Sequence, residues 1–184
     1  MALVVAVALG ASACSKDDAE PKSSDRKTIS FSDAPEGSEA LGLCRTYDLD
    51  KIKAIIGGDE HFRRLAPAAI GQEGDAVTGE VCAWERNDLN GDSLSLHIEV
   101  RNYGEDQAGL LTAYEERLDQ ATDPETVPGL GDAAFRSGDD ASTVMQIRSG
   151  QYLMSLSSAA TGTLEPVSAD TMTLLAGAGL DNLP

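Results

Sequence analysis

Residues 94–100 alternate strictly between apolar and polar side chains, which is the period of a β-strand that buries one face. A second run with apolar character, residues 81–84, precedes it along the chain. The Asn90-Gly91 pair lies between the two runs, and such a pair is a strong signal for a hairpin turn. The segment therefore predicts two antiparallel strands, and the rest of the fold has to be built around this hairpin.

The parity of the side chains decides which loop joins these strands. A two-residue turn at Asn90-Gly91 would pair Trp84 with His97, on the polar face. A three-residue loop, with Gly91 in the left-handed conformation, pairs Trp84 with Leu96 and keeps the apolar side chains on one face. We expect the second register, with Trp84 as a core residue.

The remaining elements indicate the fold class. Further strands are expected near residues 65–70 and 134–135, and at 143–147 and 152–156, the last two joined by a turn at Ser149-Gly150 that pairs Ile147 with Tyr152. Helical spacing predicts helices at 49–56, at about 105–121 and at 166–177, the last with Pro166 in its first turn. Helices between hairpin-linked strands are typical of the α+β class. We predict an antiparallel sheet with about three helices packed on one face.

The chain opens with a short apolar run, residues 1–9, followed by the small residues 11–13 and then by Cys14. The run has the length of the hydrophobic core of a signal peptide and is too short to cross a bilayer as a helix. Small residues before a cysteine resemble the lipobox of bacterial lipoproteins, whose cysteine is lipidated on sulfur after cleavage. We therefore predict a signal peptide at 1–13 and lipidation at Cys14. The charged segment that usually precedes such a run is missing, so a start further upstream stays open.

Residues 14–38 are rich in charged residues, Ser and Pro, with Ile29 and Phe31 as their larger apolar side chains. Such a stretch buries too little surface to offset the entropy of ordering it. We expect a polar tether with a span of roughly 25–30 Å. It would hold a single domain, residues 39–184, away from a membrane.

Two cysteines remain once Cys14 is set aside, Cys44 and Cys82. An even number of cysteines in an exported chain indicates a disulfide, and the chain has no CxxC pair that would indicate a redox or zinc site. We expect a Cys44–Cys82 bond, which the chain-entropy model values at roughly 4 kcal/mol. The alternative is two buried free thiols.

The net charge of −17 over 184 residues restricts the partners of the protein. Binding to nucleic-acid phosphates requires a basic surface, so this charge excludes nucleic acid as a partner. It also argues against adsorption to an anionic membrane face. The length suits one ordinary domain with tails.

Residues 88–93 resemble the start of a calcium-binding loop, with Asp88, Asn90 and Asp92 as its candidate metal ligands. Ser93 stands where such a loop needs glycine, and a strand follows where it needs a helix. An acidic β-turn is therefore the favoured interpretation, and we predict no metal.

No other motif indicates a cofactor or a catalytic group. Residues 129–134 match the GxGxxA pattern of dinucleotide sites, but Pro128 precedes them and no helical pattern follows, so we interpret them as a turn before a strand. His61 and His97 are the two histidines, and the chain has no GxSxG, HExxH or Walker A motif around them or elsewhere. We predict no cofactor, no catalytic residue and a non-enzymatic role.

The order of these features forms a pattern: a lipobox cysteine, a polar tether, Leu43-Cys44 before a short helix, Cys82-Ala83-Trp84, and residues 127–135. This pattern resembles a family of actinobacterial secreted lipoproteins that carry a domain of unknown function, over residues 41–183. The resemblance implies export, lipidation, one disulfide and an α+β fold. It supplies no catalytic residue and no ligand.

We therefore expect a lipoprotein anchored to the extracytoplasmic face of the cell membrane, with a non-catalytic binding or accessory module as its domain. Its partners would be membrane lipid, through the anchor, and an envelope protein, a glycan or a small molecule. One alternative is a carrier of a small apolar ligand or lipid, which needs a large dry cavity. The other is an exported hydrolase, which needs a cleft with converging carboxylates and shifted pKa values.

Overall fold

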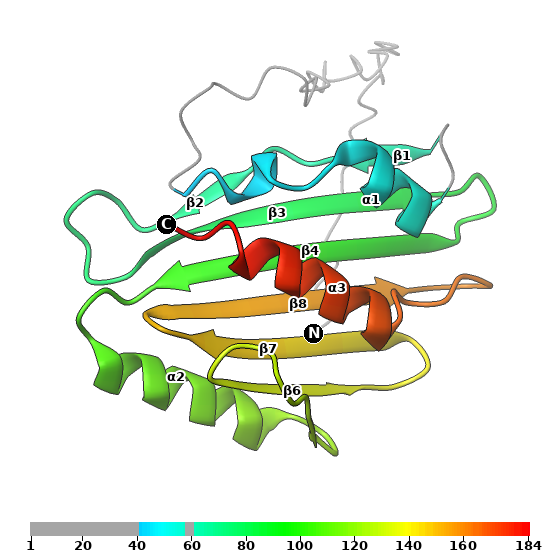
Figure 1. Cartoon of the computed structure of the whole chain (residues 1–184). Coiled ribbons are helices and arrows are strands. Elements are labelled where there is room, and N and C mark those ends of the chain that lie inside the picture. Colours follow the sequence, from blue (N-terminus) through cyan, green and yellow to red (C-terminus); the bar gives the residue numbers. More distant parts are fainter. Residues whose placement is uncertain (1–40, 58–60) are drawn as a thin grey trace, which may run out of the picture.

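The computed structural model describes residues 41–57 and 61–184, which form an antiparallel sheet with three α-helices (Figure 1). The strands follow the order β1-β3-β4-β8-β7-β6-β5, and β2 also pairs with β3. The long strands are β3 (Thr78–Asn87), β4 (Ser93–Asn102), β6 (Ala133–Gly138), β7 (Ser142–Ser149) and β8 (Tyr152–Ala160). The short strands are β1 (Phe62–Arg64), β2 (Ala68–Ile70) and β5 (Glu125–Thr126). The predicted α+β class and the antiparallel sheet are confirmed.

Each α-helix begins after a polar side chain that caps it. Asp48 accepts hydrogen bonds from two backbone N–H groups in the first turn of α1 (Leu49–Ile56). Asp106 caps α2 (Gln107–Gln120) in the same way. A short 3₁₀-helix, η2 (Leu43–Arg45), precedes α1. In the described ranges, no helix is long and apolar enough to cross a membrane.

The third helix, α3 (Ala169–Leu180), differs from the prediction at both ends. It begins after Ser168 rather than at Pro166, because the Ser168 hydroxyl accepts a hydrogen bond from the backbone N–H of Thr171 and caps the first turn. It continues through Gly177, since that glycine does not take the positive φ that ends a helix.

The first face of the sheet carries the main hydrophobic core. The β3–β4 register pairs Trp84 with Leu96 and Cys82 with Ile98, and Gly91 has a φ of 93°, so the predicted hairpin is confirmed. α1 and α3 both lie over this face (Figure 1). The buried side chains of this core also include Leu43, Ile52, Ile56, Met145, Ile147, Met154, Leu156, Met172 and Leu175.

The β7–β8 hairpin keeps the predicted face but not the predicted register. Ser149 pairs with Tyr152, so Ile147 faces Met154 instead of Tyr152. The turn therefore consists of Gly150 and the residue after it, and Gly150 has a φ of 57°. A tight turn of this kind needs a positive φ at its first central position, which glycine adopts without strain. The predicted turn would have put Ser149 there.

α2 lies on the second face of the sheet, opposite the main core. Leu153 alternates with Met154 along β8, and Phe135 alternates with Ala134 along β6, so Leu153 and Phe135 point away from that core. α2 packs Leu110 and Tyr114 against them, and the Tyr114 and Phe135 rings meet edge to face at 5.6 Å. The helices expected on one face are thus divided between both faces, with α1 and α3 on the first and α2 on the second.

Candidate functional site

Three polar side chains lie in one row across the second face of the sheet: Glu99 on β4, Ser155 on β8 and Gln146 on β7. The strand registers pair Glu99 with Ser155, and Ser155 with Gln146. The side chains of these three residues alternate with core residues of their strands, so they point toward the side where α2 lies.

Arg117 of α2 reaches all three of these side chains. Its Nη2 donates to Glu99 Oε1 at 3.0 Å, and its Nη1 donates to Gln146 Oε1 at 2.7 Å and to the hydroxyl of Ser155. The Ser155 hydroxyl in turn donates to Gln146 Oε1 at 2.6 Å. Arg101 Nε donates to Glu99 Oε1 at 2.7 Å. These five residues are named the Arg117 cluster below.

The charges of the Arg117 cluster stabilise one another in a partly buried place. The side chains of Arg117 and Glu99 are 24% and 25% exposed. Burial alone would raise the pKa of Glu99, but the hydrogen bonds and charges of Arg101 and Arg117 outweigh it and hold the pKa below its usual value. The hydrogen bond to Glu99 raises the pKa of Arg101. Glu99 is therefore ionised at neutral pH, and it holds two guanidinium groups in place.

A cleft of about 350 Å³ lies beside the Arg117 cluster, between the end of α2 and strands β6 and β7. Arg117 and Gln146 line the cleft, and so does Asp139, which follows β6. The other lining residues are Gln120, Ala121, Thr122, Phe135, Ser137, Gly138, Ser142 and Val144. Seven of the eleven lining residues carry hydroxyl, amide or charged groups, so the cleft suits a polar ligand.

Asp139 places a carboxylate in this cleft. Its Oδ1 accepts a hydrogen bond from the backbone N–H of Ala141 at 2.9 Å and another from the Ser142 hydroxyl at 2.9 Å. The bond from Ala141, followed by that from Ser142, lowers the pKa of Asp139. The cleft therefore has a negative group at the β6–β7 turn and the donors of the Arg117 cluster further along β7.

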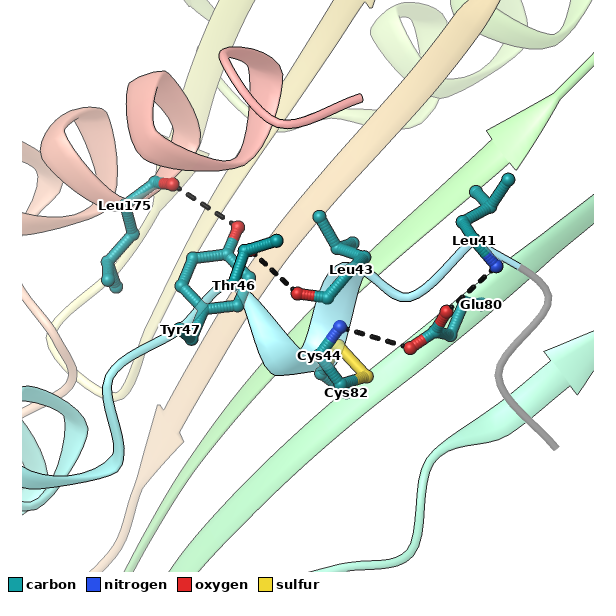
Figure 2. Close-up of a disulfide and its surroundings, with 8 residues drawn as sticks. All are labelled: Leu41, Leu43, Cys44, Thr46, Tyr47, Glu80, Cys82 and Leu175. Carbon is teal, nitrogen blue, oxygen red and sulfur yellow. Dashed lines mark hydrogen bonds between the residues drawn. A yellow bond between two sulfur atoms is a disulfide. The ribbon is translucent and has the colours of Figure 1, made fainter. Parts of the chain in front are cut away.

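The predicted Cys44–Cys82 disulfide is present, with 5.4 Å between the two Cα atoms. Glu80 precedes Cys82 on the same side of β3 and is fully buried. Figure 2 shows that its carboxylate accepts hydrogen bonds from the backbone N–H groups of Cys44, at 3.0 Å, and of Leu41, at 3.1 Å. Sequence reasoning missed Glu80, although the parity that turns Cys82 and Trp84 inward also turns Glu80 inward.

Glu80 and the two sulfur atoms are close enough to form a metal site: one oxygen of Glu80 and both sulfurs lie within 4.8 Å of one another. However, the sulfurs are bonded to each other, and the carboxylate oxygens accept the two backbone N–H groups. The group therefore fastens η2 and the residues before it onto β3.

The candidate metal ligands of the 88–92 loop are engaged in other interactions. Asp88 accepts two hydrogen bonds from the guanidinium of Arg86, at 2.7 and 2.6 Å. Asp92 accepts from the backbone N–H of Thr163, at 3.1 Å, and from its hydroxyl, at 2.6 Å, while Asn90 accepts from the backbone N–H of Asp92 at 3.1 Å. These bonds close the loop and tie it to the segment after β8, which supports the interpretation as an acidic turn.

The 129–134 segment leads into β6, as the sequence predicts. Gly131 has a φ of 60°, and a Cβ there would lie 2.6 Å from the carbonyl oxygen of Arg148. The close approach of these two backbone segments therefore requires glycine. Of the two histidines, His97 lies in β4 and pairs with Ser157 on the second face, and His61 immediately precedes β1. Neither lines the cleft.

Cys14, the predicted signal peptide and the predicted tether lie outside the described residues. Comparison of the chain with models of known protein families, with curated proteins and with solved structures finds no match. The resemblance to actinobacterial secreted lipoproteins therefore stays a prediction.

Proposed function

We propose that the protein is a lipoprotein anchored to the extracytoplasmic face of the cell membrane, and that its domain is a non-catalytic binding module of the cell envelope. The apolar run 1–9, the small residues before Cys14 and the polar composition of residues 14–38 support the anchor. The Cys44–Cys82 disulfide supports export, because such bonds form and persist outside the reducing cytoplasm.

The Arg117 cluster and the cleft beside it carry the proposed binding role. Arg117 crosses three strands, and its hydrogen bonds fix the polar groups of the cluster in one geometry, which is what a binding site requires. Seven of the eleven residues that line the cleft next to it have polar or charged side chains. This lining suits a polar ligand better than the apolar ligand or lipid of a carrier.

The ionisation of the two carboxylates beside the cleft also supports binding over hydrolysis. General acid–base catalysis works best with a group whose pKa lies near the operating pH. The pKa of Glu99 and the pKa of Asp139 are instead both held below their usual values. Both groups stay ionised and orient the donors that surround them.

Metabolic labelling with radioactive palmitate tests the anchor. The full chain, expressed from its own gene in a bacterium that lipidates exported proteins, is expected to take the label and to sediment with membranes. Cys14→Ala is expected to lose the label, whereas the double variant Cys44→Ala/Cys82→Ala is expected to keep it. An unlabelled wild-type protein in the cytosol, with Cys44 and Cys82 reduced, contradicts the proposal.

Cosedimentation with cell-envelope fragments tests the binding role. The purified full chain is expected to bind the fragments saturably, and Arg117→Lys is expected to weaken this binding, because lysine is a point charge that cannot bridge three acceptors in the same plane. Asp140→Asn is the matched control, since Asp140 is exposed and does not line the cleft. Equal binding by all three proteins would exclude the cleft as the binding site.

A further inference from the structure

The side-chain amide of Gln146 has a fixed orientation. Its Oε1 accepts hydrogen bonds from Arg117 and Ser155, and a guanidinium group only donates, so the oxygen has to face Arg117. The amide nitrogen therefore points away from this contact. In the part of the chain that the structure describes, the nitrogen has no hydrogen-bond partner, and it is exposed to solvent, because it is not one of the fully buried polar atoms without a partner.

Gln146 is 8% exposed, so nearly all of this side chain is buried, and it lines the cleft. The amide nitrogen itself reaches solvent, so water accepts from its N–H donors until a ligand takes that place. The cleft thus offers two N–H donors that are held in position and can bind an acceptor group of a ligand in place of water. Arg117 lines the cleft beside them and adds a positive charge that Glu99 balances.

The opposite end of the cleft is acidic. Asp139 lines the cleft there, and it also lines an adjoining hollow of about 350 Å³ together with Asp123 and Glu125. Arg136 pairs with Glu125 at 2.7 Å. The total charge of −17 adds a long-range repulsion for anions. A simple anion therefore does not fit this cleft, whereas a ligand with a cationic end and an acceptor end does.

The strand geometry gives the separation of the two ends. Ser142, which donates to Asp139, and Gln146 are four positions apart on β7, which corresponds to roughly 13 Å along the strand. Extended peptide advances about 3.3–3.6 Å per residue, so about three residues span roughly 10 Å, and a hydrogen bond of about 3 Å to the protein makes up the difference from roughly 13 Å. A cleft of 350 Å³ lies at the small end of the range for ligand pockets, which agrees with a ligand of this size.

We propose that the cleft binds a short peptide of about three residues with free ends, or a zwitterion of that length. Its carboxylate or last carbonyl would accept from the Gln146 amide and Arg117, and its ammonium group would lie against Asp139. This inference rests on the proposed binding role and names the ligand class of the same site.

NMR titration of the full, ¹⁵N-labelled chain with trialanine tests the proposal. We expect the side-chain amide signals of Gln146 to shift as trialanine binds. N-acetyl-trialanine, which has no ammonium group, is expected to bind at least tenfold more weakly, because a charge-assisted hydrogen bond is lost. Asp139→Asn is expected to cause the same loss for trialanine and no further loss for the acetylated peptide.

Three variants make the test specific. Asp139→Asn keeps the Oδ1 acceptor for Ala141 and Ser142, so the turn is expected to fold as before. Gln146→Glu keeps the acceptor for Arg117 and Ser155 but replaces the N–H donors with an oxygen, and it is expected to abolish binding without lowering the melting temperature. Asp140→Asn is the matched control and is expected to leave the affinity unchanged.

The proposal is overturned if trialanine at about 10 mM, a concentration that reveals even millimolar affinity, leaves the Gln146 signals in place. It is also overturned if the acetylated peptide binds as well as trialanine, or if acetate and inorganic phosphate cause the same shifts as trialanine. If palmitate labelling and envelope binding persist while trialanine fails, only the ligand class is wrong and the proposed function stands.

Discussion

Replacement of Glu80 tests whether this buried carboxylate holds the start of the domain in place. Glu80→Ala removes the acceptor of two backbone N–H groups, those of Cys44 and Leu41. The bond to Cys44 is buried, so its N–H group cannot turn to water without moving η2 away from β3. The bond to Leu41 is only partly buried, so that group regains some of its hydration.

The expected cost follows from these two bonds. A buried N–H group left without a partner costs about 1–3 kcal/mol. The Cys44 N–H group is expected to contribute this full cost and the Leu41 N–H group only part of it. The lost packing of the Glu80 side chain adds about 1 kcal/mol. We expect Glu80→Ala to lower the free energy of unfolding by about 3–4 kcal/mol. Glu80→Gln keeps one acceptor oxygen and is expected to cost about half as much.

Urea unfolding followed by tryptophan fluorescence measures this cost, because the chain has one tryptophan, Trp84, and it is 1% exposed. Glu85→Ala is the matched control, since Glu85 lies on the same strand but on the second face, and we expect a change within about 0.5 kcal/mol there. If Glu80→Ala destabilises the protein no more than Glu85→Ala, the carboxylate does not fasten η2 and the reasoning is refuted.

Three further predictions concern stability. Cys44→Ala/Cys82→Ala is expected to lower the free energy of unfolding, measured in urea, by about 3–4 kcal/mol. A change below about 1 kcal/mol would argue against a stabilising Cys44–Cys82 disulfide. Gly131→Ala is expected to cost about 1–2 kcal/mol more than Gly129→Ala, because both glycines have positive φ but only a Cβ at Gly131 meets backbone; equal melting temperatures would contradict this. The pKa of Glu99 in the folded protein lies below its usual 4.5, so Glu99 stabilises the fold above that pH, and this stabilisation is lost as the pH falls through the folded pKa. In an acid titration, the free energy of unfolding of Glu99→Gln should therefore fall less than that of the wild type.

The sequence predicted best the parts of the fold that depend on parity. The alternation in β4 and the position of Gly91 were sufficient to pair Trp84 with Leu96, because one residue of slip would move the whole apolar set to the other face. The β7–β8 register was wrong by a step that preserves parity, since pairing Ile147 with Met154 or with Tyr152 buries the same face. Hydrophobic patterning cannot distinguish these two registers, and the position of Gly150 in the turn decides between them.

The candidate site could not be predicted in this way. Leu110 and Tyr114 indicate which side of α2 is buried, but not which face of the sheet receives it, and the sheet has apolar residues on both faces. Ser155 and Gln146 have the spacing of ordinary outward-facing residues, so their sequence gives no sign that Arg117 joins them. The cleft depends on where α2 ends relative to β6 and β7, which is a matter of tertiary packing.

The arrangement of the domain bears on how the proposed anchor and the cleft would work together. The described chain begins at Leu41, which Glu80 and the disulfide hold against the first face of the sheet at β3. The cleft lies on the second face at β6 and β7, and strands β4 and β8 separate β3 from β7. At the usual strand spacing this is roughly 15 Å across the sheet, in addition to its thickness. Leu41, where the segment from the proposed anchor joins the described domain, therefore lies on the side of the sheet away from the cleft.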